Sequence, residues 1–330
     1  MVILLTQRER DMFLSPMRDA CLGMLYIARG EELLRYSFSG AHPMNRVRLE
    51  SFYKALDESG LKYSVFKPVM ASLEELRLFH DEDYIKFVQY ASWQGYGYLD
   101  YGDTPAFPGV FEAASYVVGT TLGLVKLVLR EDCRGFNPMG GLHHAMSSKA
   151  GGFCVFNDAA VAIKYLLERE KVRAVAYVDI DAHHGDGVYY EFEEDPRVIF
   201  FDIHQDGRTL YPGTGFRYED GRGAGKGKKL NIPLPPGADD TDFKNAFDEG
   251  LAFLEKHDFD FVLLQCGADG IEDDPLTRLE YSPASHRYAA TALRKLAGER
   301  CGGRIVAMGG GGYNPENVAR AWMEVALSLA

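Results

Sequence analysis

The sequence predicts a single-domain α/β fold in which a parallel β-sheet lies between two layers of helices. Apolar runs rich in β-branched residues alternate with helical patterns along the chain, and this order of elements produces a parallel sheet covered on both faces. The runs are apolar throughout rather than at every second position, as strands buried on both faces are. No internal repeat and no low-complexity linker divides the 330 residues, so we expect one domain.

The elements follow from local patterns. Strands are predicted at 173–180, 198–203, 259–266 and 304–308, with a weaker strand at 24–27. Helices are predicted at 157–169, 241–257, 283–296 and 315–329. Asn157 can cap the first helix, and a proline stands near the first turn of the last two. The glycine-rich segment 213–229 is expected to be a long surface loop between two strands.

Composition excludes several classes of partner. The chain has 48 acidic and 36 basic side chains and a net charge of −12, which disfavours nucleic acid and anionic membrane surfaces. Every long uncharged run is interrupted short of the ~20 apolar residues that cross a bilayer, and the first ten residues do not resemble a secretory signal. Five cysteines without a CxxC pair are expected to be reduced and mostly buried, which indicates a cytoplasmic protein.

Polar residues gather directly after the four stronger strands. They are Asp179, Asp181, His183, His184 and Asp186 after the first, His204 after the second, Asp269 after the third, and Gly309 to Gly312 with Tyr313 after the fourth. Because ligands bind beyond the carboxyl ends of parallel strands, we expect one site at this edge of the sheet.

Asp181, His183 and Asp269 are candidate metal ligands. Asp181 and His183 stand two residues apart at a strand end, so their side chains lie on the same side of the chain. Carboxylate oxygen and imidazole nitrogen bind Zn²⁺ or Fe²⁺, and three protein ligands leave a position for water, as in catalytic sites. A polar cluster without metal is the alternative for a lone Asp-x-His pair, but contributions from several strands favour the metal.

The adjacent residues His143 and His144 lie in a glycine-flanked loop and suit proton transfer, because neutral imidazole accepts a proton near pH 7. A carboxylate behind each ring would fix its tautomer, and Asp179 and Asp186 are available for this. Two loop histidines without a role remain the alternative. The glycines before Tyr313 either form a flexible turn or bring the backbone close to the site, so that Tyr313 donates to a developing oxyanion.

Eight segments together carry a family resemblance: 42–48, 79–84, 140–162, 177–188, 207–215, 231–237, 265–276 and 309–322. They resemble the histone deacetylase superfamily, which has the arginase–deacetylase fold, and within it the class I-like enzymes of the bacterial acetoin-utilization branch. The resemblance begins near residue 23. It therefore implies an N-terminal extension at 1–20 and a deacetylase catalytic domain at 21–330.

The resemblance implies metal-dependent hydrolysis of acetyl or other acyl groups on protein lysines. For the reacting centre it implies Asp181, His183 and Asp269 as ligands of Zn²⁺ or Fe²⁺, His144 backed by Asp186 as general base and acid, His143 backed by Asp179 as orienting residue, and Tyr313 as the group that polarises the acyl carbonyl. Metabolic enzymes such as an acyl-CoA synthetase are the implied substrates.

The resemblance also implies roles around this centre. They are Asp103 as the rim residue that holds substrate amides, Gly152, Phe153, Tyr211 and Gly311 along the acyl-lysine tunnel, Leu276 at its mouth, Arg48 near the acetate-release pocket, and Asp179, Asp181, His183 and Asp202 around a structural K⁺ or Na⁺. Two residues depart from the family pattern. Tyr211 stands where Phe is common, and Asp202 stands where a small hydroxyl residue is usual, so the acyl preference and the alkali-cation site are left open.

Three rival functions remain as alternatives. An arginase-like enzyme resembles this chain in fold but needs two metals, and Gly185 and Gly267 stand where it carries further carboxylates. An acetylpolyamine deacetylase is the second candidate, although Leu276 replaces its acidic gatekeeper. A non-catalytic acyl-lysine binder would be expected to lack a catalytic residue, and none is missing.

Overall fold

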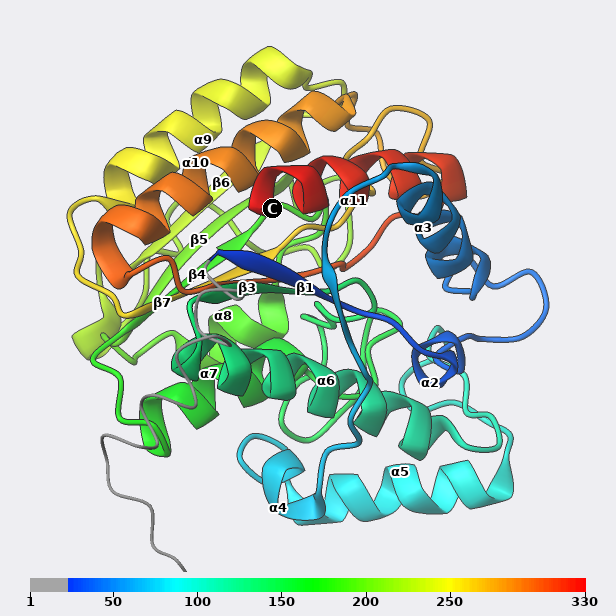
Figure 1. Ribbon diagram of the computed structural model, residues 1–330. Helices are drawn as coiled ribbons and strands as arrows, with labels where there is room; N and C mark the ends of the chain where they lie inside the picture. The colour runs from blue at the N-terminus through cyan, green and yellow to red at the C-terminus, as the bar shows by residue number, and fades with distance from the viewer. Residues whose placement is uncertain (1–22) are drawn as a thin grey trace, which may run out of the picture.

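The computed structural model describes residues 23–330, and both the N-terminal extension 1–20 and Cys21 lie outside this range. One parallel sheet of eight strands, in the order β2-β1-β3-β8-β7-β4-β5-β6, forms the centre of the molecule (Figure 1). The strands are β1 Met24–Ala28, β2 Ser64–Phe66, β3 Cys133–Asn137, β4 Val175–Asp179, β5 Val198–Gln205, β6 Lys229–Leu234, β7 Phe261–Gln265 and β8 Ile305–Met308. The predicted fold class is therefore confirmed.

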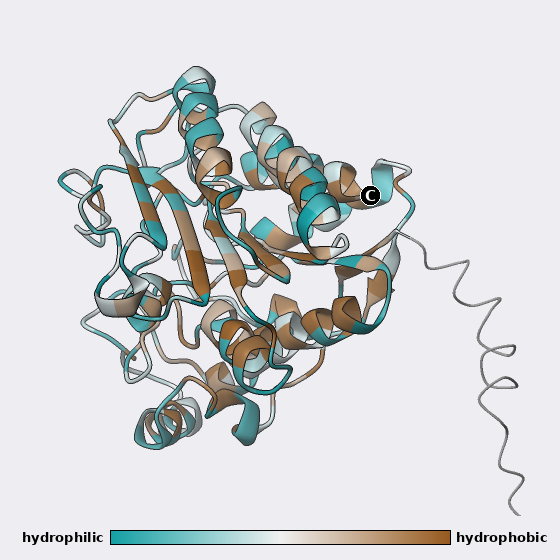
Figure 2. Cartoon of the chain, turned by 90° about the vertical axis from the view of Figure 1, so that its left-hand side faces the viewer, coloured by the Kyte–Doolittle hydropathy of each residue, from teal (hydrophilic) through white to brown (hydrophobic). Residues whose placement is uncertain are grey.

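Helices cover both faces of the sheet. They are α2 Glu31–Leu34, α3 Val47–Glu58, α4 Leu73–Leu76, α5 Glu82–Gln94, α6 Val110–Arg130, α7 Asp158–Glu168, α8 Asp186–Phe192, α9 Asp240–Leu254, α10 Pro283–Cys301 and α11 Pro315–Leu329. Figure 1 shows α3, α9, α10 and α11 on one face and α6, α7 and α8 on the other, with α5 outside α6. In Figure 2 the strands are largely hydrophobic and the helices carry polar residues on their outer sides.

The four stronger predicted strands and the weaker one are present, but β2, β3 and β6 were not predicted. β3 contains Arg134 and Gly135, which break its apolar pattern. Gly135 has a packing reason, because a Cβ there would lie 3.2 Å from both Leu124 and Val306. β6 contains Pro233, which a sheet tolerates at its edge, and β6 is the last strand in the order. Segment 213–229 lies between β5 and β6, so the loop was expected, but the next strand was predicted only at 259–266.

Helix α6 limits the expectation that no segment is long enough to cross a membrane. By length and composition alone, α6 is long and apolar enough to span a bilayer, but 67% of its most apolar window is buried inside the protein. The helix packs against β3, β8 and α7, so its apolar side chains belong to the core of this fold. The described cysteines, Cys133, Cys154, Cys266 and Cys301, are buried.

Trp322 of α11 fixes the edge of the sheet where the polar residues gather. Its ring is fully buried, and its indole N–H lies 3.2 Å from the carbonyl of Cys266 and 3.1 Å from that of Gly309. These carbonyls follow β7 and β8, so α11 holds the starts of two site loops in place.

Candidate active site

Five neighbouring strands deliver the candidate residues to one place. β3, β8, β7, β4 and β5 are adjacent and parallel, so the loops that follow them leave the sheet at the same edge. The structure brings the metal ligands and the glycine loop, which the sequence placed after predicted strands, together with the two histidines, which follow the unpredicted strand β3.

Asp181, His183 and Asp269 form a buried cluster whose ligand atoms lie within 4.8 Å of one another. His183 Nδ1 is 3.1 Å from Asp181 Oδ1 and 3.0 Å from Asp269 Oδ2. The remaining carboxylate oxygens are held by the protein. Asp181 Oδ2 accepts from Gln265 Nε2 at 2.8 Å, and Asp269 Oδ1 accepts from the backbone N–H of Ala182 at 2.8 Å. One nitrogen and two carboxylate oxygens therefore converge on one point, a donor set that fits Zn²⁺ or Fe²⁺.

The electrostatics of this cluster also favour a cation. Burial, and then the negative charge of Asp181, raise the pKa of Asp269 to about 7. Burial opposes protonation of His183, but hydrogen bonds to Asp181 and Asp269 raise its pKa to about 10. Two buried carboxylates around one imidazole thus form a strongly negative environment, and a bound cation offsets the cost of burying them.

Glycines surround the cluster because no side chain fits. A Cβ at Gly267 would lie 2.0 Å from Asp181 Oδ2, and a Cβ at Gly311 would lie 2.1 Å from Asp269 Oδ2. Gly311 also donates its N–H to Asp181 Oδ2 at 2.8 Å. An additional carboxylate at position 267 would collide with a candidate ligand, so the geometry argues against a two-metal site of arginase type.

His143 and His144 face each other across the floor of the site, with Nε2 atoms 3.1 Å apart. His143 Nδ1 lies 2.8 Å from Asp179 Oδ2, and His144 Nδ1 lies 2.7 Å from Asp186 Oδ1. The Tyr177 hydroxyl donates to Asp179 Oδ2 at 2.6 Å. Each imidazole therefore has the carboxylate that the sequence suggested, and its Nε2 points into the site.

The environments of the two rings push their pKa values apart. Burial, followed by the positive charge of His143, lowers the pKa of His144 to about 4. Burial acts against protonation of His143 as well, but Asp179 and Asp181 raise its pKa to about 10. A protonated ring beside a neutral one is the arrangement of an acid–base pair, in which His144 is free to accept a proton.

Two residues at the start of α7 hold the histidine loop, and sequence reasoning missed both. Asn157 Nδ2 donates to the carbonyls of His143 at 3.2 Å and Ala145 at 2.9 Å. Asp158 accepts from the N–H of Leu142 at 2.8 Å, and from that of Gly141 at 3.0 Å. Both side chains are buried. The sequence signal for Asn157 was its capping position, since its side chain also accepts the N–H of Ala160 in α7. Asp158 follows it directly as the first residue of the helix.

The loop 309–312 passes close to the site and presents Tyr313. Gly310 and Gly312 have φ values of 72° and 109°, which favour glycine, and a Cβ at Gly309 would lie 2.0 Å from the carbonyl of Pro138. The N–H of Tyr313 donates to Asp274 at 2.7 Å, which fixes its backbone. Burial and the charges of Asp269 and Asp181 raise the pKa of Tyr313 well above its usual value, so its hydroxyl remains a donor.

Arg48 of α3 lies beneath Tyr313. Its guanidinium donates to the carbonyls of Gly312 and Gly310, the second at 2.6 Å. It also stacks between the rings of Tyr313 and Trp322, at 5.4 and 5.5 Å. A small cavity of about 10 Å³ beside Tyr313 is lined by Met44 rather than by Arg48, so Arg48 supports the glycine loop.

The proposed tunnel residues lie above the histidines. The ring of Tyr211 is 5.0 Å from that of His144, and the ring of Phe153 is 5.7 Å from that of Tyr313. Phe153 has a φ of 69°, which is rare for a bulky residue, and the Tyr36 hydroxyl holds its carbonyl at 2.7 Å. Gly152 has no room for a side chain, because a Cβ there would lie 2.4 Å from His144. Leu276 is 40% exposed and lies two residues after Asp274, the residue that accepts the backbone N–H of Tyr313.

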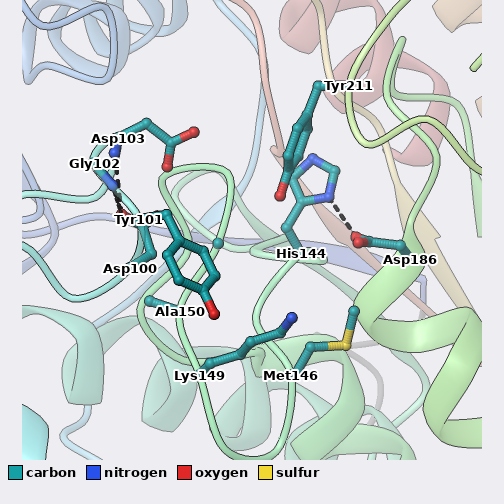
Figure 3. A pocket seen from close by; sticks show the side chains of 11 residues that line it. Asp100, Tyr101, Gly102, Asp103, His144, Met146, Lys149, Ala150, Asp186 and Tyr211 are labelled. Carbon is teal, nitrogen blue, oxygen red and sulfur yellow. Dashed lines mark hydrogen bonds and ion pairs between the residues drawn. The ribbon is translucent and has the colours of Figure 1, made fainter.

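Asp103 belongs to a loop organised by Asp100. Asp100 Oδ1 accepts the N–H groups of Gly102, Asp103 and Thr104 at 2.9–3.0 Å. Asp103 lines a cavity of about 300 Å³ that reaches His144 and Tyr211 (Figure 3). The structure thus brings the expected rim residue to the mouth of the site.

Asp202 lies in register with Asp179 on the neighbouring strand, and both are fully buried. Asp202 Oδ1 is 2.6 Å from His204 Nδ1, and Oδ2 accepts from the N–H of Gly185 at 2.9 Å. Both carboxylate oxygens of Asp202 therefore have partners within the protein. The cation remains a prediction from family resemblance.

The comparisons with known proteins agree with this site. Residues 42–329 match the family model described as histone deacetylase domain, so the chain belongs to the histone deacetylase family, whose members are deacetylases and are generally metal-dependent. Among the relatives is the acetoin utilization protein AcuC of Bacillus subtilis (strain 168). It is 38% identical over an alignment of 314 positions, and the match covers 88% of this chain and 79% of AcuC. A probable deacetylase of Archaeoglobus fulgidus is 35% identical over an alignment of 295 positions, and the match covers 87% of this chain and 80% of that protein.

Solved structures show the same fold. The HD domain of HDA15 superposes with a TM-score of 0.86 and 28% identity, covering 93% of this chain and 89% of that one. An HDAC homologue complexed with SAHA superposes with a TM-score of 0.82 and 32% identity, covering 93% and 83%. The recognition of the family and of the arginase–deacetylase fold from sequence is therefore confirmed.

Proposed function

We propose that this protein is a metal-dependent lysine deacylase that removes acetyl, or another acyl group, from protein lysines. One observation carries the proposal: the triad Asp181–His183–Asp269, the carboxylate-backed histidine pair and Tyr313 converge on one buried point. Family membership supports amide hydrolysis, and the exposed Leu276, in place of an acid, supports an acyl-lysine rather than a polyamine.

A divalent metal held by the triad, Zn²⁺ or Fe²⁺, would supply a Lewis acid that polarises the acyl carbonyl and makes water nucleophilic. His144 would accept the proton of the attacking water at Nε2, because Asp186 holds the other ring nitrogen. His143, charged and held by Asp179, would keep the pair oriented. Tyr313 would donate a hydrogen bond to the developing oxyanion, and protonated His144 would return its proton to the leaving lysine amine.

The substrate path follows from the same geometry. The acyl-lysine stem would pass between Phe153 and Tyr211, with Asp103 holding the backbone amides of the substrate at the rim. Acylated metabolic enzymes in the cytoplasm, such as an acyl-CoA synthetase, are the proposed substrates.

The test is hydrolysis of peptides that carry acetyl-lysine or longer acyl-lysines, beside acetylpolyamines, by protein supplied with Zn²⁺. The wild type should be compared with Tyr313→Phe and His144→Ala, with Tyr218→Phe as a matched control at an exposed tyrosine. Acyl-lysine turnover that both site substitutions abolish and the control retains supports the proposal. Turnover of acetylpolyamines alone would establish the second candidate, and binding of acyl-lysine without turnover would establish a binder.

A further inference from the structure

Exposed aromatic side chains gather in one segment of the chain. Within residues 23–330, six of the nine exposed Phe, Tyr and Trp residues lie between positions 87 and 101, namely Phe87, Tyr90, Trp93, Tyr96, Tyr98 and Tyr101. Residues 87–109 contain no lysine, arginine or histidine. Single exposed apolar side chains are normal on a protein surface, but such a concentration of aromatic residues is typical of a surface that binds another molecule.

Half of these aromatic residues lie on an arm that leads from the end of α5 to the rim of the site. We call residues 95–106 the aromatic arm, and its exposed rings are those of Tyr96, Tyr98 and Tyr101. The arm folds back on itself, because the N–H of the buried Leu99 donates to the carbonyl of Thr104 at 2.8 Å. The Thr104 hydroxyl accepts the N–H of Phe153 at 3.1 Å, so the tip of the arm is fixed to the wall of the proposed tunnel.

The rings of the aromatic arm have no cation of this chain above them. Within the described part of the chain, seven aromatic rings have a Lys or Arg side chain over them, at 5.0–5.8 Å from the ring centroid. None of the seven lies between positions 87 and 109. Because the face of an aromatic ring attracts a cation, the rings of the arm are available to a cation of another molecule.

The tip of the arm borders an acidic cavity. Tyr101 lines the cavity of about 300 Å³ beside His144, which we call the rim cavity. The lining also contains the charged residues Asp100, Asp103, Asp186 and Lys149. Three carboxylates stand against one ammonium group, so the lining has an excess of two negative charges. Figure 3 shows Tyr101 on the side of the rim cavity opposite Tyr211, with carboxylates on both sides.

These charges decide which partner fits the surface. The carboxylates of the rim cavity repel an acidic or phosphorylated segment. A second copy of this chain has the same net charge of −12, so self-association there is disfavoured. A basic segment suits both features, because its cations are attracted by the carboxylates and by the faces of the rings. Arginine suits them best, since its planar guanidinium stacks on aromatic rings.

We propose that the aromatic arm and the rim cavity bind an arginine-rich segment of the protein that carries the acyl-lysine. The inference rests on the proposed function, because the acyl-lysine of that protein enters the site beside the tip of the arm. Arginine side chains stack on Tyr98 and Tyr101, and the carboxylates of the rim cavity attract them. These contacts form on binding and do not change during the reaction, so they lower KM and leave kcat unchanged.

The experiment uses acetyl-lysine peptides of equal length that differ in three consecutive residues, which are all Arg, all Gln or all Glu. One set places them before the acetyl-lysine and a second set places them after it. In at least one set, kcat/KM should favour Arg over Gln by about five- to thirtyfold, as expected for two exposed cation–π contacts, and the difference should lie in KM. The Glu peptide should be the poorest substrate, and high salt should reduce its disadvantage.

Paired substitutions test whether the rings carry this preference. Leucine at both Tyr98 and Tyr101 keeps an apolar surface without a ring, so the double variant Tyr98→Leu, Tyr101→Leu should lose most of the Arg preference. The double variant Tyr98→Phe, Tyr101→Phe keeps both rings and should retain it. Tyr218→Leu is the matched control, at an exposed tyrosine between β5 and β6, and should leave the preference unchanged. The readout is the ratio of the Arg to the Gln peptide, so a general change in activity cancels.

Equal kcat/KM for the Arg and Gln peptides in both sets would overturn the inference, and so would an Arg preference that the double leucine variant retains. If the wild type hydrolyses no acetyl-lysine peptide, the proposed function fails. Fluorescence anisotropy of the same peptides, labelled with a dye, then decides the inference by itself. Binding of the Arg peptide that the leucine pair weakens upholds the inference, and equal binding of the Arg and Gln peptides rejects it.

Discussion

Substitution of Gly311 by alanine should disable the metal site through one methyl group. The Cβ would lie 2.1 Å from Asp269 Oδ2, the oxygen that faces His183, and ordinary contact begins at 3.4 Å. The carboxylate cannot simply rotate away, because its other oxygen accepts from the N–H of Ala182. The φ of Gly311 lies outside the left-handed region, so alanine adds no backbone strain and the effect is steric.

The magnitude follows from the required shift. Asp269 Oδ2 must move by about 1 Å, whereas metal–oxygen distances tolerate about 0.2 Å. Changes at residues that only orient ligands cost about 10- to 100-fold in metal affinity, so we expect Gly311→Ala to weaken Zn²⁺ binding by at least about 100-fold, or about 2.7 kcal/mol.

The assay is competition for Zn²⁺ against a chromophoric chelator, with thermal unfolding of the metal-free protein as a check of the fold. Gly298→Ala is the control, because this glycine lies within α10 and a Cβ there meets nothing within 4 Å. It should leave Zn²⁺ affinity unchanged and stabilise the protein by up to about 1 kcal/mol. Zn²⁺ affinity of Gly311→Ala within threefold of wild type, with the fold intact, would refute the proposed ligand set.

Three further predictions follow. Tyr313→Phe should lower kcat by about 100- to 1000-fold with little change in KM, because the hydroxyl acts on the transition state. Steady-state kinetics measures both constants, and a change in KM alone would contradict this role of Tyr313. Burial and Asp100 raise the pKa of Asp103 to about 6, so KM for acyl-lysine peptides should rise as pH falls below 6, and Asp103→Asn should lack this dependence. Burial lowers the pKa of His80 from about 6.5 to about 3. The stability of the fold that depends on neutral His80 is therefore fully present above pH 6.5. It declines by about 1.4 kcal/mol per pH unit as pH falls from 6.5 toward 3. Urea unfolding at pH 7.5 and 5.5 should therefore show a smaller loss in His80→Gln, and an equal loss would contradict the argument.

The reacting centre was predictable because its residues are close in sequence or follow strong strands. Asp181 and His183 are two residues apart after an apolar run, and Asp269 follows another such run. Asp179 and Asp186 could be paired with the histidines, because one carboxylate was needed behind each ring. The three strands that were missed have weak local patterns, as Arg134 and Pro233 show, and they become strands through pairing with their neighbours.

The sequence by itself determined the fold class, the family and the identity of the groups around the candidate metal, because these depend on local pattern and residue chemistry. Only the tertiary structure decided which partner each group has. It joined Asn157 and Asp158 to the histidine loop and placed Asp202 against His204. These pairings connect segments whose relative positions depend on how the strands are ordered in the sheet and how the helices pack, which local sequence does not specify.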